Sequence, residues 1–227
     1  MREQLTYAQL VKKQGRSVII KDPPKIFVAG LICIAHDLPK NPCHSVESTL
    51  IAGKTTSTNV LSFGFILTSA GANGNDQFFV EDEICIPDVY NSVIGQPINE
   101  DHEQSFHAIV GNITQSSFLE ASEAMPSSIY CGGEIYSDIY PDVAKKVQRG
   151  AGRWAAVSME AIPNPLEMVG KYLVIHMPKF VGAGLVRFPA NEYSQIDEVD
   201  GQHIQDTYAE VARLTNPFRL AVRSLFF

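Results

Sequence analysis

A serine and a histidine in this sequence have the types and settings that nucleophilic catalysis needs. Ser158 lies in the apolar segment RWAAVSMEA (153–161), and His102 lies in the polar segment PINEDHE (97–103). A serine hydroxyl becomes a strong nucleophile when a nearby base removes its proton, and histidine does this near neutral pH. Such pairs assemble in space, so distance along the chain does not argue against this one. We expect Ser158 as a nucleophile and His102 as its base; a hydrogen-bonded core serine and a solvated histidine are the alternative.

A second set of residues has the types that bind zinc: His36, Asp37, Cys43 and His44. Their spacing fits no common zinc signature, and two prolines interrupt the segment. A metal-dependent hydrolase is therefore the lesser alternative, and we expect neither a metal nor another cofactor.

Composition and charge narrow the class of protein. The chain has 227 residues, of which 45% are hydrophobic and 19% charged, as in an ordinary globular protein. The formal charge of −7 and the lack of a Lys/Arg-rich run argue against a nucleic-acid ligand. No apolar run approaches the roughly 20 residues that span a bilayer, and the start has no signal-peptide core. We expect a cytoplasmic protein without a membrane partner, whose four cysteines are free thiols.

The segments that must position these residues are mostly strands. Apolar and β-branched runs predict strands at 25–35, 60–68, 77–80, 106–113, 128–136, 154–161, 172–176 and 180–188. Helical spacing predicts helices at 141–148 and 202–214. The βαβ alternation of a parallel sheet is missing. The expected fold class is therefore α+β, with a mostly antiparallel β-barrel of about seven strands surrounded by helices.

The chain divides into three expected parts. Residues 1–24 form a loosely held N-terminal arm, residues 25–200 the β-barrel domain, and residues 201–227 a C-terminal helical segment and tail. The tail, 217–227, is apolar with two arginines. We expect it to pack on its own domain; an amphipathic helix that docks on a partner is the alternative.

Several motifs in order resemble one family. PINEDHE (97–103) is followed by VGNI (110–113), then by WAAVSME (154–160) and by FVGAGLVRFPAN (180–191), and FVAGLI (27–32) fits the opening strand. Their order and spacing resemble the prohead (procapsid maturation) proteases of tailed bacteriophages, above all those of large myoviruses with a T-even-like head. The resemblance covers roughly residues 25–195.

The resemblance implies a fold, an activity and substrates. The fold is that of herpesvirus assemblin, and the activity is that of a serine protease with Ser158 as nucleophile and His102 as general base. Such a protease acts inside the immature head, in the host cytoplasm. It cleaves scaffold and core proteins, the major capsid protein precursor and itself after glutamate, and an oligomer is compatible with this. Self-cleavage after Glu198 is a hypothesis of this reading. A catalytically inactive head scaffold or structural protein with the same fold is the alternative.

The third catalytic residue is left open by the sequence. Several relatives carry an acid close to the position of Gly182, with Gly184 nearby, and glycine cannot orient an imidazole. A second histidine is the assemblin arrangement, so His176 is the first candidate, followed by His36 and Asp37. The two glycines could open backbone N–H groups to a developing oxyanion; a twisted or bulged strand is the alternative.

Overall fold

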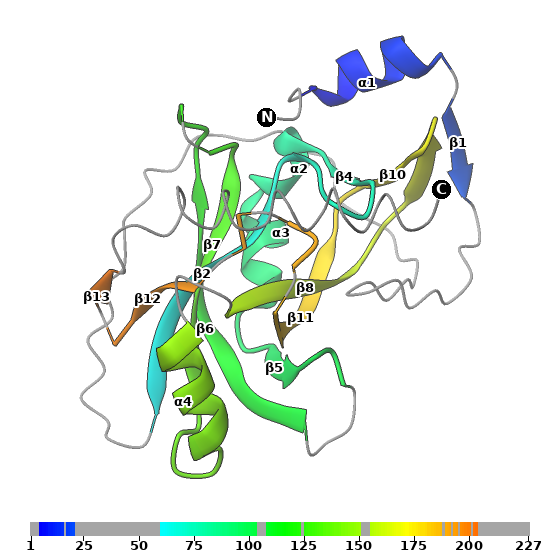
Figure 1. The fold of residues 1–227 in the computed structure, drawn as a ribbon. Helices are drawn as coiled ribbons and strands as arrows, with labels where there is room; N and C mark the ends of the chain where they lie inside the picture. Colours follow the sequence, from blue (N-terminus) through cyan, green and yellow to red (C-terminus); the bar gives the residue numbers. More distant parts are fainter. Residues whose placement is uncertain are drawn as a thin grey trace, which may run out of the picture.

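The computed structural model of the protein describes residues 5–15, 17–20, 60–103, 108–123, 125–150, 155–187, 189–191, 193–194, 196–200 and 202–203. These residues form two β-sheets with short helices around them (Figure 1). The class is α+β with mostly β content, as predicted.

The larger sheet has eight strands and curls into a half-barrel. In spatial order they are β13 (Gln202–His203), β12 (Ile196–Val199), β2 (Leu61–Ser69), β7 (Ser128–Ile135), β6 (Ile109–Leu119), β5 (Pro97–Glu100), β11 (Lys179–Val186) and β8 (Ala156–Ile162). All neighbours are antiparallel except β5 and β11, which run parallel. The mostly antiparallel arrangement was predicted.

Two backbone hydrogen bonds connect the last strand of this sheet to the segment that leads into β12. Val157 N donates to Ser194 O at 3.0 Å, and Ile196 N donates to Ala155 O at 3.3 Å. The curled sheet encloses the main core, to which β2, β6, β7, β8 and β11 contribute fully buried side chains. Because β8 is held on both sides, its position relative to β11 and β5 is well determined.

The smaller sheet has the order β1 (Ser17–Ile20), β9 (Leu166–Val169), β10 (Tyr172–Ile175), β4 (Gln77–Phe79) and β3 (Gly71–Ala72). β1 pairs antiparallel with β9 over four residue pairs. Helix α1 (Tyr7–Gln14) precedes β1; a capping box of Thr6 and Gln9 begins it. Leu10 of α1 is fully buried against this sheet. Residues 5–15 and 17–20, expected in a loosely held arm, therefore include a helix and a strand that dock on the body.

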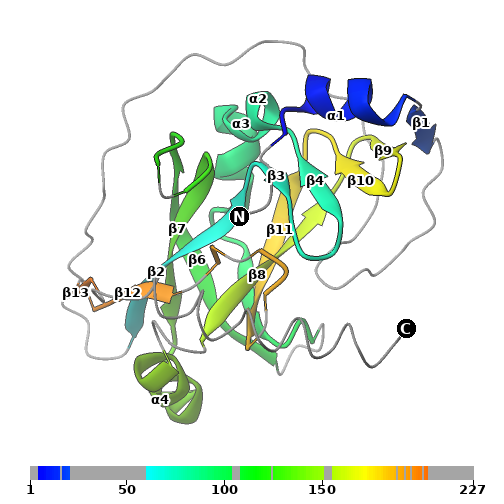
Figure 2. The same cartoon turned by 45° about the horizontal axis from the view of Figure 1, so that its top comes forward.

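Four further helices complete the described part of the fold: α2 (Glu81–Ile84), α3 (Pro87–Tyr90), the 3₁₀ helix η1 (Asn91–Val93) and α4 (Pro141–Gly150). Figures 1 and 2 place α4 at the end of the larger sheet opposite to α2 and α3, while α1 lies beside β9 and β10. α4 begins at a proline, which suits the first helical position, and buries Val143, Ala144 and Val147.

The predicted strands at 60–68, 128–136, 154–161, 172–176 and 180–188 correspond to β2, β7, β8, β10 and β11, and the helix at 141–148 to α4. β6 continues beyond the predicted strand at 106–113 through residues 114–119, because these residues continue the ladder with β7. The strand at 25–35 and the tail lie outside the described residues. Of the helix predicted over 202–214, only residues 202–203 are described, and they form β13.

The free-thiol expectation holds for one described cysteine only. Cys131 is a free and fully buried thiol, whereas Cys85 is disulfide-bonded. Within the described part of the chain, no helix combines the length and apolarity that crossing a membrane requires.

Candidate active site

Alternation along β8 places Ser158 and Glu160 on one face of the sheet. Val157 and Met159 point into the main core, where their side chains are 0% and 6% exposed. Because successive side chains of a strand point to opposite faces, Ser158 and Glu160 share the other face. Residues at this spacing lie about 6.7 Å apart along the strand, a gap that one imidazole with a hydrogen bond on each nitrogen can bridge.

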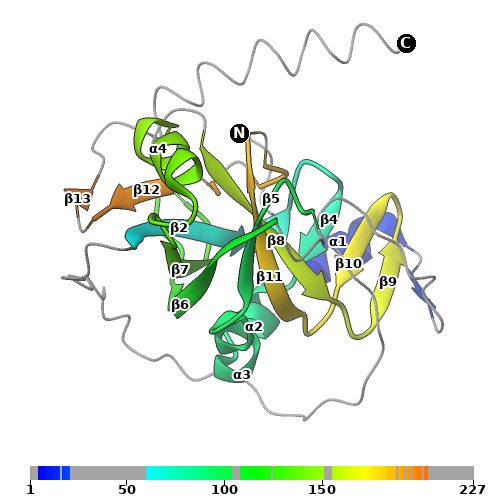
Figure 3. The same cartoon turned by 90° about the horizontal axis from the view of Figure 1, so that it is seen from below.

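Two glycines of β11 create the space for such an imidazole. Gly184 is the register partner of Ser158, and Gly182 is the partner of Glu160 (Figure 3 shows the two strands side by side). A Cβ atom at Gly184 would lie 2.7 Å from Nδ1 of His102, and one at Gly182 would lie 2.7 Å from Oε2 of Glu160. The ring of His102 therefore occupies the volume that a side chain at residue 184 would fill. The two glycines cannot themselves orient an imidazole, but they make room for the ring of His102 and for the carboxylate of Glu160.

A tight turn after β5 brings His102 into this space. The N–H of Glu103 donates to the carbonyl of Glu100 at 2.9 Å, and the N–H of Asp101 donates to Leu185 of β11 at 3.0 Å. The two central residues, Asp101 and His102, have φ of +49° and +60°. Left-handed conformations at non-glycine residues cost about 1–3 kcal/mol each and cluster at functional sites. Asp and His are among the residues that tolerate them best.

One nitrogen of His102 contacts a buried carboxylate. Nδ1 lies 3.0 Å from Oε1 of Glu160, and the side chains are 17% and 4% exposed. Asn99 of β5, the register partner of Gly184, donates Nδ2 to the same oxygen at 3.3 Å. An ionised Glu160 can only accept a hydrogen bond, so a neutral His102 beside it must carry its ring hydrogen on Nδ1. Its Nε2 then has no hydrogen and can accept a proton. This is the tautomer that a histidine base needs.

Ser158 lies next to this pair with its hydroxyl available. It is partly exposed, and its side chain makes no hydrogen bond with the residues that the structure describes, His102 included. Directly opposed residues of an antiparallel pair have Cα atoms about 4.5–5.5 Å apart, so the ring over Gly184 lies immediately beside Ser158. Catalytic hydrogen bonds are often long without substrate and shorten when it binds. The register of β8 and β11 thus places Ser158 and the ring of His102 on one face of the sheet.

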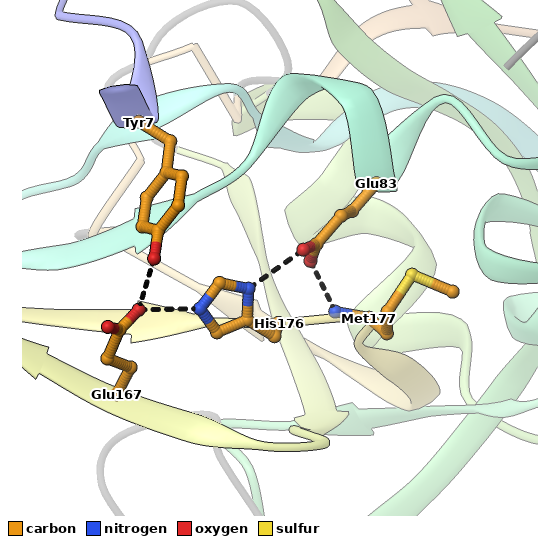
Figure 4. Close-up of polar contacts among 5 residues, drawn as sticks. All are labelled: Tyr7, Glu83, Glu167, His176 and Met177. Carbon is orange, nitrogen blue, oxygen red and sulfur yellow. Dashed lines mark hydrogen bonds and ion pairs between the residues drawn. The ribbon is translucent and has the colours of Figure 1, made fainter. Parts of the chain in front are cut away.

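His176 lies elsewhere, at the end of β10. Both of its ring nitrogens contact carboxylates: Nδ1 lies 2.8 Å from Glu83 of α2, and Nε2 lies 2.9 Å from Glu167 of β9 (Figure 4). The Tyr7 hydroxyl donates to Glu167 at 2.6 Å, and the N–H of Met177 donates to Glu83 at 2.6 Å. We call His176, Glu83, Glu167 and Tyr7 the His176 cluster. The residue that contacts Nδ1 of His102 is Glu160, so the expected role of His176 as its orienting partner does not fit this geometry.

The protonation equilibria of the His176 cluster reflect these contacts. Burial alone would lower the pKa of His176, but the hydrogen bonds to Glu83 and Glu167 outweigh it and raise this pKa. Burial opposes ionisation of Glu167, yet hydrogen bonds from Tyr7 and His176 hold its pKa below the ordinary value. Burial and the neighbouring Glu167 raise the pKa of Tyr7 to about 12. The cluster connects α1 to the body as a structural polar group.

The remaining candidates lie outside the described residues. These are His36 and Asp37 as alternatives for the third catalytic residue, and the possible zinc ligands around them, Cys43 and His44. In the described segments, no group of three or more His, Cys, Asp or Glu side chains is arranged to hold a metal ion.

Glu160 is the site residue that the sequence reading missed. The signal was present, because polar residues at 158 and 160 alternate with apolar ones and so share a face of the strand. β5 is also absent from the predicted strands, because its segment is polar and includes a proline and a glutamate. Proline is tolerated at the first residue of a strand, and the pairing of β5 with β11 depends on tertiary contacts.

Comparison with known proteins adds no relative to this geometry. No protein-family model, no curated protein and no solved structure matches the chain significantly.

Proposed function

We propose that the protein is a serine endopeptidase with Ser158 as nucleophile, His102 as general base and Glu160 as the carboxylate that orients the base. The observation that carries this proposal is the 3.0 Å contact between His102 Nδ1 and Glu160, on the face that also presents Ser158. A serine, a histidine and a carboxylate in this order are recognised by geometry and roles, whatever the fold.

Each residue has a defined task in the reaction. His102 Nε2 removes the proton of the Ser158 hydroxyl while the oxygen attacks the substrate carbonyl carbon. The carbonyl π electrons move to oxygen, and when they return the C–N bond breaks and His102 gives its proton to the leaving amine. Glu160 holds the ring and stabilises the imidazolium, and it stays ionised throughout. Water then repeats the sequence on the acyl-enzyme and releases Ser158.

The biological substrates are proposed from the family resemblance. We infer that the protein cleaves scaffold and core proteins, the major capsid protein precursor and itself after glutamate during phage head maturation. The assemblin-like description of the barrel belongs to the same proposal. Glu198, the hypothetical self-cleavage position, lies in β12, which pairs with β2. Cleavage after Glu198 therefore requires that β12 leave the sheet, so we expect it only in chains where this edge has opened.

The activity is tested on purified protein with a peptide that contains Ile-Asp-Glu and with a fluorophosphonate, which labels activated serines. We expect cleavage after glutamate and a single label on Ser158, both abolished by Ser158→Ala with an unchanged melting temperature. An exposed control is Ser122→Ala, which should label and cleave like the wild type. Wild-type protein that neither cleaves nor labels would support the inactive structural alternative, and cleavage blocked only by a chelator would support the metal hydrolase.

The orienting carboxylate is tested separately with Glu160→Gln. The amide keeps the size of the side chain but loses the charge that selects the useful tautomer of His102. By analogy with amide substitutions in other triads, we expect kcat to fall about 10²- to 10⁴-fold with KM little changed. Glu167→Gln, the same change beside His176, should leave kcat unaltered. Equal kcat values for the wild type and Glu160→Gln would remove Glu160 from the mechanism.

A further inference from the structure

A small pocket adjoins Ser158 along the outer edge of β8. It is lined by Ser158, Met159, Thr68, Gln77, Asn191 and Ser194, among others, and none of the described residues that line it is charged. Its size allows about one water molecule, which is too small for a substrate side chain but suits a single oxygen atom.

One wall of the pocket carries an unpartnered amide donor. Gln77 is 1% exposed, and its Nε2 has no hydrogen-bond partner among the residues that the structure describes. The orientation of this amide follows from its neighbours. Asn73 Oδ1 accepts from the N–H groups of Asn75 at 2.9 Å and Gln77 at 3.1 Å, so Asn73 must present its Nδ2 to Gln77. That Nδ2 donates to Gln77 Oε1 at 2.8 Å. The network leaves the NH₂ group of Gln77 as a buried donor that lacks an acceptor.

A backbone donor is directed to the same edge. Val157 uses its N–H for Ser194, on the side of β8 away from β11. In an antiparallel ladder, hydrogen-bonded and non-hydrogen-bonded pairs alternate, so Met159, two residues further on, directs its N–H to the same outer side. No described residue accepts a hydrogen bond from this group on that side.

We infer that this pocket is the oxyanion site, in which the Gln77 side-chain amide and the Met159 N–H donate to the substrate carbonyl oxygen. Buried donors without acceptors destabilise a fold, and an oxygen that becomes negative during attack by Ser158 satisfies both. The inference rests on the proposed protease function. It assigns a catalytic role to β4, which belongs to the smaller sheet.

The decisive variant is Gln77→Glu, which retains an oxygen for Asn73 and replaces only the donor with a carboxylate oxygen. Removal of one oxyanion donor lowers kcat about 10²- to 10³-fold, and we expect at least this loss on the Ile-Asp-Glu peptide with KM within about threefold. Affinity for the corresponding peptide aldehyde, whose hemiacetal oxygen occupies the same site, should fall in parallel. Gln77→Met, which has no donor or charge, should lose activity in the same way.

The control is Gln9→Glu. The side-chain oxygen of the exposed Gln9 accepts a hydrogen bond from the N–H of Thr6, and glutamate keeps this oxygen. The kcat and the affinity for the peptide aldehyde should therefore stay at wild-type values. Melting temperature and circular dichroism identify folded variants, and Gln77→Met decides if Gln77→Glu does not fold. A kcat within threefold of the wild type in a folded Gln77 variant means that the pocket holds a structural water, and it overturns the inference while Ser158 labelling stands. If the wild type does not label at Ser158, both proposals fail.

Discussion

Two histidines of this protein contact glutamates at nearly the same distance, yet only one is arranged for proton transfer. His102 has a carboxylate on Nδ1 at 3.0 Å, and its ring lies on the face that presents the hydroxyl of Ser158, with which no described residue makes a hydrogen bond. His176 has a carboxylate on each nitrogen, at 2.8 Å and 2.9 Å, and connects three elements. A histidine with both nitrogens engaged has no position left for a substrate proton. The number of partners, more than the presence of a His–Glu contact, separates the two roles.

The backbone supports the same contrast. His102 lies in a turn with two consecutive left-handed residues, a conformation that is retained only when surrounding contacts impose it. His176 follows directly after β10 and is held by side chains from α2 and β9. The histidine itself is left-handed at position 102, whereas beside His176 the left-handed residue is the next one, Met177 (φ of +39°), and His176 is held by its two hydrogen bonds.

The strongest test of the comparison replaces each histidine with asparagine, which tolerates the left-handed region well. His102→Asn should lower kcat about 10⁴-fold or more, because the base is lost, and should destabilise the fold by about 1–3 kcal/mol, because the buried Glu160 loses one partner and keeps Asn99. His176→Asn should leave kcat within about threefold of the wild type. It should destabilise the fold by about 2–4 kcal/mol, because Glu83 and Glu167 lose their common partner. Peptide cleavage and urea denaturation measure the two effects, and a reversed pattern would exchange the roles assigned to the histidines.

A smaller effect on the same site is expected from Gly184→Ala. The added methyl group would lie 2.7–2.9 Å from three atoms of the His102 ring, so the ring must move from its position over β11. Misplacement of a catalytic group by about 1 Å can cost 10²-fold, and we expect a loss of this order in kcat. Gly132→Ala is the control. Gly132 lies in β7, and the methyl group added there would contact the flexible side chain of Gln115 in the neighbouring strand β6, away from the site. If Gly184→Ala keeps the kcat of the wild type, the His102 ring does not act as the base from its position over Gly184 of β11.

The sequence predicted the parts of this arrangement that follow from local pattern. Apolar runs indicated β8 and β11, and the residue types indicated Ser158 and His102. What the pattern could not reveal depends on which strands are neighbours. Glu160 becomes the partner of His102 only because β5 lies parallel to β11, and Gly184 matters only because it lies opposite Ser158. His176 was a reasonable candidate by residue type, and only the positions of α2 and β9 show that both nitrogens are engaged.

The smallest expected effect is the pH dependence that distinguishes the His176 cluster from the active site. The pKa of His176 is raised, so its contribution to stability is fully present below the unfolded pKa of about 6.5 and is lost as pH rises through the folded pKa. The pKa of Glu167 is lowered, so its contribution is present above the unfolded value of about 4.3 and is lost as pH falls through the folded value. The two contributions coincide between these unfolded values.

The destabilisation caused by His176→Asn should therefore be largest near pH 5.5 and should decrease when the pH is raised to 9, because the protonated form of His176 that the two carboxylates stabilise is lost over this range. Tyr7, with a pKa of about 12, keeps its proton over this range and does not contribute to the change. Urea denaturation of the wild type and the variant at both pH values measures the difference. A difference independent of pH would mean that His176 has the same protonation equilibrium in the folded and unfolded chains, which would contradict its raised pKa.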